Sequence, residues 1–286
     1  MTTNTTDLAR EALERSLEVR DEHDYDYRSP LCVYELCDKA RVSVRFVDDV
    51  SMEGVYAALS KPSIILSSLR PLTRRAFTCA HEFGHHVFGH GSTIDELKDE
   101  AEREVFNPEE FLVEAFAGYL LMPAQAVKRA FSSRQLRMDD ATPEDIYAVA
   151  SSFGVGYETL IGHLAYGLRY IQRDRAETLR KTKLPKIRER ILGERTQEHL
   201  VIADRHHAIG TLDAEVGNLV LLPEGAETES DRIEPVKDLV AGRVFRAVRP
   251  GLARVEAEGF GVIVRVSRMQ YAGLARYRHL EETDGE

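Results

Sequence analysis

Apolar residues recur at helical spacing in the first part of the chain. Between residues 6 and 20 they predict an amphipathic helix, which Asp7 is placed to cap, and the apolar positions are Leu8, Ala12, Leu13, Leu17 and Val19. The acidic and polar residues 21–28 predict a loop, and a second, shorter helix is predicted from Pro30. These elements lie ahead of a segment with a different pattern.

Alternation replaces the helical spacing between residues 42 and 67. Segments 42–47, 54–59 and 63–67 are short and apolar and predict three strands. Pro62 stands directly before the third segment, where its missing N–H does least harm to a sheet. The edge of such a sheet can pair with an extended peptide, although the pattern does not identify the edge strand.

The next helix, predicted from Pro71 to about Gly89, contains His81-Glu-Phe-Gly-His85, an H-E-x-x-H pattern. His81 and His85 are four positions apart, so both imidazoles can face one metal ion. Glu82 is rotated by about 100° from His81 and can hold a water bound to that metal. Imidazole and carboxylate ligands with one open position suit zinc. Because ordinary helices also contain this short pattern, the hypothesis requires a third ligand.

A strongly apolar helix at residues 109–122 supplies candidates for that ligand. Asn107-Pro108 predicts its start and Pro123 its end. Glu110 and Glu114 are four positions apart and share a face that is otherwise apolar. Burying carboxylates costs several kcal/mol unless a partner such as a metal ion or a histidine N–H offsets it. The charged stretch 94–103 ahead of this helix predicts a solvated helix or loop.

Together the two helices resemble the ImmA/IrrE family of metallopeptidases, which have a gluzincin-type zinc site. The resemblance covers about residues 30–170, and Val113-Glu114 departs from the family's usual Ala-Asn or Ala-Asp. The matching residues are His81-Glu82-Phe83-Gly84-His85, His90 and Glu110-x-x-x-Glu114-x-Phe116-Ala117-x-x-Leu120-Leu121-Met122-Pro123. The resemblance implies that Glu110, rather than Glu109, is the third zinc ligand. It also implies that Glu114 orients a ligating histidine.

The resemblance further implies zinc-dependent hydrolysis of a peptide bond, with Glu82 as the general base. Zn²⁺ is the expected ion, and Mn²⁺ is the alternative. The tetrahedral oxyanion needs a further hydrogen-bond donor, for which His90, Tyr119 and Tyr56 are candidates.

Family members cleave helix-turn-helix repressors, so the expected partner is an XRE-type repressor whose cleavage releases stress-response or mobile-element genes. The alternative is a zinc-stabilised regulator that binds DNA or a repressor without cleaving it. The presence of Glu82 favours the enzyme, because a structural metal site needs no base.

Beyond the two motifs, residues 142–164 predict a helix, a tight turn and a second helix, as in a helix-turn-helix. This segment either packs on the catalytic helices or binds DNA. Residues 169–195 hold ten basic and four acidic side chains, a local charge of +6, and predict a linker with solvated helices or a contact with nucleic acid. Short strands are predicted at 200–203, 208–210, 218–222, 243–248, 252–256 and 261–266.

The expected fold class is therefore α+β. A mainly helical zinc-peptidase domain with a small sheet spans residues 1–135, a helix-turn-helix-like segment spans 136–180, and a β-rich C-terminal domain, a candidate sensor, spans 181–286.

Composition narrows the setting. The 286 residues are 43% hydrophobic and 30% charged, as in a soluble globular protein. A net charge of -10 argues against a general nucleic-acid coat protein. Three cysteines are too few for a disulfide framework and fit a reducing compartment. The first residues lack the features of a secretory signal, and no apolar run reaches the ~20 residues of a membrane span. The expected location is the cytoplasm, without a membrane partner.

Overall fold

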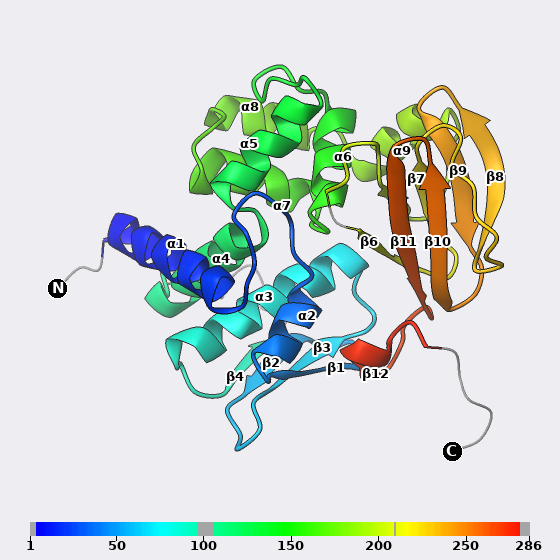
Figure 1. The fold of residues 1–286 in the computed structure, drawn as a ribbon. Coiled ribbons are helices and arrows are strands. Elements are labelled where there is room, and N and C mark those ends of the chain that lie inside the picture. The colour runs from blue at the N-terminus through cyan, green and yellow to red at the C-terminus, as the bar shows by residue number, and fades with distance from the viewer. Residues whose placement is uncertain (1–3, 97–105, 209, 281–286) are drawn as a thin grey trace, which may run out of the picture. The chain divides into compact units, whose positions relative to one another are not determined.

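The structure is a computed structural model that describes residues 4–96, 106–208 and 210–280. The chain has an α+β fold, as predicted, with two compact units (Figure 1). The first unit comprises residues 1–129, 162–169 and 272–276, and the second comprises 130–161, 170–271 and 277–286. Neither unit is one continuous stretch of chain.

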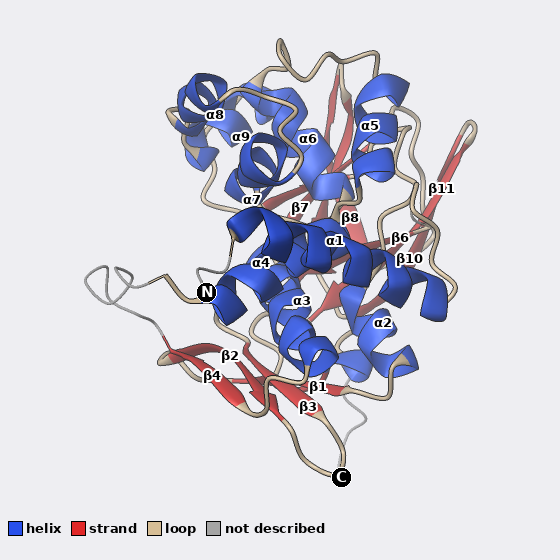
Figure 2. Ribbon diagram, turned by 90° about the vertical axis from the view of Figure 1, so that its left-hand side faces the viewer, coloured by secondary structure: helices blue, strands red, loops and turns tan. Residues whose placement is uncertain are grey.

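The first unit is built on a five-stranded sheet with the order β12-β1-β3-β2-β4. Strands β1 and β3 are parallel, and β2 runs antiparallel to both β3 and β4. The strands are β1 (Ser43–Val47), β2 (Met52–Ala57), β3 (Ser63–Ser67), β4 (Thr93–Glu96) and β12 (Gly273–Leu274). One face of the sheet is covered by α2 (Val33–Lys39) and α3 (Leu72–Phe88), with α1 (Thr5–Glu22) and α4 (Pro108–Leu121) above them (Figure 2).

These elements confirm the four predicted helices and three predicted strands of this region, with β2 starting two residues early. Two details were wrong. Asn4, not Asp7, caps α1, since its side chain accepts a hydrogen bond from the Thr6 N–H at 3.1 Å. Part of the charged stretch 94–103 forms strand β4, because pairing with β2 satisfies its backbone; the remainder lies outside the described residues.

A buried arginine joins α1 to the end of α4. The Arg20 side chain is fully buried, and its Nε donates a hydrogen bond to the Leu120 carbonyl at 2.9 Å. Its Nη1 donates to the carbonyls of Ser29, at 3.1 Å, and Asp26. Burial lowers the pKa of Arg20 to about 10, so the guanidinium is charged at neutral pH. The last carbonyls of a helix carry partial negative charge, which offsets part of its desolvation.

A buried histidine packs against the other side of α4. His163 begins a π-helical turn, His163–Gly167, after α7 (Tyr157–Gly162). Its Nε2 lies 2.9 Å from the Met122 carbonyl oxygen, and a Cβ built at Gly118 or Gly167 would lie 2.9 or 2.6 Å from its Nδ1. Burial lowers the pKa of His163 to about 4. The neutral ring therefore donates its Nε2–H to Met122 at physiological pH.

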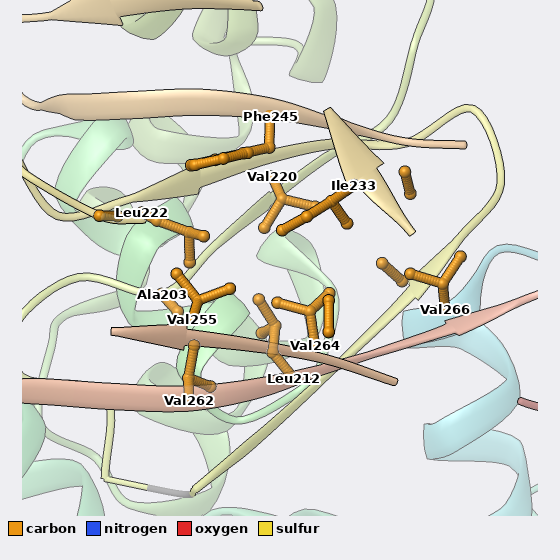
Figure 3. Close-up of a cluster of buried hydrophobic side chains, with 14 residues drawn as sticks. Ala203, Leu212, Val220, Leu222, Ile233, Phe245, Val255, Val262, Val264 and Val266 are labelled. Carbon is orange, nitrogen blue, oxygen red and sulfur yellow. The ribbon is translucent and has the colours of Figure 1, made fainter. Parts of the chain in front are cut away.

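The second unit contains two sheets, with the orders β10-β11-β6 and β5-β7-β9-β8. The strands are β5 (Leu200–Ile202), β6 (Thr211–Glu215), β7 (Leu219–Leu222), β8 (Ile233–Leu239), β9 (Gly242–Ala247), β10 (Gly251–Ala257) and β11 (Phe260–Ser267). Their inner faces form a hydrophobic core, in which Phe245 and Val220 of one sheet face Leu212 and Val264 of the other (Figure 3). The β-rich C-terminal region is thus confirmed.

Two strand predictions in this unit need correction. The strand expected at 208–210 is instead β6, which starts at Thr211, while residue 209 lies outside the described residues. Strand β8 was not predicted, because it contains Pro235 and three charged residues, which are uncommon in strands. Pairing with β9 is irregular between Pro235 and Lys237, and β8 ends its sheet, the position where a sheet tolerates proline.

The predicted helix-turn-helix segment forms α6 (Pro143–Ser152) and α7, separated by a turn in which Gly154 has a φ of 65°. Helix α7 is six residues long, and Tyr157, Leu160 and Ile161 are buried. Its exposed side chain is the acidic Glu158. These features support the interpretation of this segment as a packing element.

The basic stretch 169–195 forms α8 (Arg173–Arg180) and α9 (Leu184–Leu192). Arg175 donates to the Ala141 carbonyl at 2.6 Å and Arg188 to the Glu198 carbonyl at 3.0 Å. Arg190 pairs with Glu144 at 3.1 Å. Three of the ten basic side chains of this stretch thus bond within the second unit. The three cysteines are free thiols, and no helix among the described residues has the length and apolarity to cross a membrane.

We predict that His163 makes the free energy of unfolding depend on pH. The unfolded chain binds this proton near pH 6.5 and the folded chain near pH 4, so stability falls as the pH is lowered between these values. Between pH 7 and pH 5 the loss is about 2 kcal/mol. His163→Gln keeps the N–H donor without titrating, so urea unfolding of the EDTA-treated variant will show a smaller loss. Exposed His206→Gln is the control, and an equal loss in both variants would contradict the prediction.

Candidate metal centre

Helix α3 turns two of its faces toward different neighbours. It starts after Pro71 and ends at Gly89, whose φ of 70° is left-handed. Gly84 packs on α4, since a Cβ there would lie 3.0 Å from Val113 Cβ and 3.1 Å from Phe116 Cδ1. The close approach of α4 therefore explains why a glycine stands inside α3. This packing brings the H-E-x-x-H residues next to the carboxylates of α4.

Three of the predicted residues converge. His81 Nε2 lies 3.3 Å from Glu110 Oε2, and His85 Nε2 lies 3.9 Å from Glu110 Oε1. All three ligand atoms are within 4.8 Å of one another, and among the described residues this is the group of His, Cys, Asp and Glu side chains that could hold a metal ion. Glu109 is exposed and lies outside it.

The spacing is compatible with a metal ion. Tetrahedral ligands bound to zinc at 2.0–2.1 Å are about 3.3–3.4 Å apart, and the two nitrogen–oxygen distances are 3.3 and 3.9 Å. The His85 side chain is 1% exposed, that of His81 12% and that of Glu110 31%. Exposure thus rises from His85 to Glu110, and the group is reached by solvent from the Glu110 side.

His90 contacts His85, one of the three candidate metal ligands. Its Nδ1 lies 3.0 Å from the Nδ1 of His85, so one ring donates to the other. If Nε2 of His85 binds a metal, its proton is on Nδ1 and His90 is the acceptor. The predicted orienting residue, Glu114, is instead exposed. Position 114 lies about 40° further round α4 than Glu110, on the solvent side.

The two tyrosines proposed as oxyanion donors have internal partners. The Tyr56 hydroxyl lies 2.8 Å from His86 Nδ1, and the Tyr119 hydroxyl donates to the Gly167 carbonyl at 3.1 Å. Burial raises the pKa of both tyrosines and lowers that of His86. The Tyr56–His86 pair is therefore neutral at pH 7. The sequence did not single out His86. It differs from His81 and His85 because it faces Tyr56 of β2 and not Glu110.

The site combines a histidine pair on one helix, a glutamate on a second helix and a carboxylate next to the first histidine, an arrangement typical of metallopeptidases. The match to known families agrees. Residues 37–164 match the model of the peptidase M78 family, described as an IrrE N-terminal-like domain. Residues 37–164 are therefore similar to the peptidase domain of the ImmA/IrrE family, as their motifs indicated. No curated protein matched the chain in a sequence search.

We predict that Glu110 and Glu109 differ in metal binding. Glu110→Ala removes one of three ligands and will abolish copurification of zinc, whereas Glu109→Ala will retain one ion per chain. Elemental analysis of the purified variants measures this directly. Equal zinc contents would remove Glu110 from the ligand set.

We also predict a role for His90 in metal affinity. Partners that orient a ligand typically change metal affinity by about 10–100-fold. His90→Ala is therefore expected to weaken zinc binding by this factor in a chelator competition, while exposed His206→Ala leaves it unchanged. An unchanged affinity in His90→Ala would show that the contact with His85 is incidental.

Proposed function

We propose that the protein is a zinc-dependent endopeptidase that cleaves a specific protein. The observation that carries the proposal is the convergence of His81, His85 and Glu110, with Glu82 on the adjoining face of the same helix. The match of residues 37–164 to a metallopeptidase family supports the same chemistry. A purely structural metal site would need the three ligands but not the fourth residue.

In this proposal His81, His85 and Glu110 hold the ion, and His90 keeps the proton of His85 on Nδ1. Zinc, when bound, lowers the pKa of water to about 7 and polarises the scissile carbonyl. Glu82 accepts the proton of the attacking water and transfers it to the amine that leaves. Since Glu82 is fully buried, bulk water does not compete for its carboxylate.

Strand β4 is the proposed docking edge for the substrate. It ends the sheet on one side, and it pairs with β2 through Gly54 and Asp95. The outer backbone groups of such an edge can pair with an extended peptide. Adjacent strands are about 4.8 Å apart, so a peptide on β4 would lie about 10 Å from β2, the strand that packs against α3. An accessible, extended segment of a folded protein fits this edge.

The proposed substrate is a helix-turn-helix repressor of the XRE type, whose cleavage would release stress-response or mobile-element genes. Support comes from the family's motifs in residues 37–164. A linker between the DNA-binding and dimerising parts of a repressor would supply the extended segment that β4 requires.

The test compares the wild type with Glu82→Gln, using repressors encoded beside the protein's own gene. We expect both to bind one zinc, and kcat to fall by about 10²–10⁴ in the variant, because a general base contributes that much. Glu109→Gln, an exposed glutamate of α4, is the matched control and should cleave normally.

Two outcomes would reject the proposal. If the wild type binds zinc and cleaves no repressor but binds one tightly, the protein is a non-proteolytic regulator. If Glu82→Gln cleaves as fast as the wild type, the base lies elsewhere.

A further inference from the structure

The face of α3 that turns toward the sheet carries Thr78, Glu82 and His86, which are spaced four residues apart. Strand β2 lies opposite. A Cβ built at Gly54 would lie 2.6 Å from Thr78 Cγ2, 2.8 Å from Glu82 Oε1 and 3.0 Å from Glu82 Cγ. Real side chains do not approach so closely. The Glu82 side chain therefore occupies space that any other residue at position 54 would fill.

Backbone conformation does not explain this glycine. Gly54 does not have a positive φ, so alanine could adopt its backbone angles. Its partner in β4 is Asp95, and the pairing shifts between Met52 and Gly54, which leaves Glu53 as an extra residue in β2. The bulge sets which residues of β2 face α3. What requires glycine is the close approach of strand and helix.

Contacts on both sides of Gly54 hold β2 against α3. Glu53 pairs with Arg74 in the first turns of α3 at 2.5 Å. Tyr56 binds His86, about three turns later, at 2.8 Å. Since the strand is held on each side of position 54, it cannot easily retreat from an added side chain. The flexible end of Glu82 would move instead.

We propose that Gly54 is a positioning residue for Glu82: the missing side chain leaves the space in which the carboxylate lies, and the backbone of β2 forms the wall behind it. This inference rests on the proposed peptidase function. It separates two glycines by their effects. Gly54 sets the place of the proton acceptor, whereas Gly84, on the α4 side, sets the distance between α3 and the ligand Glu110.

The first experiment compares three glycine-to-alanine variants of the full chain, with zinc affinity, kcat and KM measured on a cleaved repressor. Gly54→Ala should keep zinc affinity and KM within about twofold and lower kcat at least tenfold, a part of the roughly 10²–10⁴ that a general base contributes. Gly84→Ala should weaken zinc binding. Gly261→Ala, where a Cβ meets nothing within 4 Å, should match the wild type.

Two results would overturn the proposal. An unchanged kcat in Gly54→Ala would show that Glu82 is not displaced. A loss of zinc in Gly54→Ala equal to that in Gly84→Ala would show a general distortion of α3 rather than a displaced carboxylate.

A second experiment needs no substrate, so it stays informative if the peptidase proposal fails. Thr78→Ser removes the Cγ2 atom nearest to position 54 and leaves Glu82 as the obstacle. In that background, Gly54→Ala should lower the midpoint of thermal unfolding, and adding Glu82→Ala should remove at least half of this loss. An equal loss with and without the Glu82 carboxylate would refute the contact.

Discussion

The close packing of α3 on α4 is the constraint on which the candidate metal centre depends. A helix contributes two histidines to one ion by its own geometry, but the third ligand must come from a separate element. Gly84 lets Val113 and Phe116 approach the α3 backbone, and the same approach brings Glu110 to His81 and His85. Glycine costs roughly 1 kcal/mol of helix propensity relative to alanine. A bulkier residue at position 84 would push α3 and α4 apart and move Glu110 away from the two histidines.

Helix α4 is itself fixed from several directions. Arg20 binds the carbonyl of Leu120, and His163 binds that of Met122, so both side chains satisfy carbonyls at the C-terminal end of the helix. Asn107 caps the opposite end, where its side chain accepts from the Glu109 N–H at 3.0 Å. Glu110 stands in the first turn, next to that cap. The ligand therefore sits on the part of α4 that is anchored by its own sequence.

The candidate metal ligands could be predicted from the sequence because their spacing is local. His81, Glu82 and His85 lie within one and a half turns, and Glu110 belongs to a run of residues that resembles a family. The exposure of Glu114 could not be predicted, because an apolar composition does not show which side of a helix faces solvent. His90 was a candidate for the oxyanion donor, and its contact with His85 could not be predicted because it depends on the left-handed turn at Gly89. Gly54 gave no signal at all, since its neighbours are 24 and 28 positions away.

Strand β12 shows that the first folded unit extends beyond the segment that matches the family. The matched family segment ends at residue 164, yet residues 273–274 complete the sheet by pairing with β1, and Arg276 binds Asp38 of α2 at 2.7 Å. Helix α1, with its buried Arg20, precedes the matched segment. A fragment cut to the family's boundaries would expose an unpaired edge of β1, which favours association with other strands. Segments before and after the matched residues thus belong to the first unit, so the peptidase part cannot be isolated by a single cut.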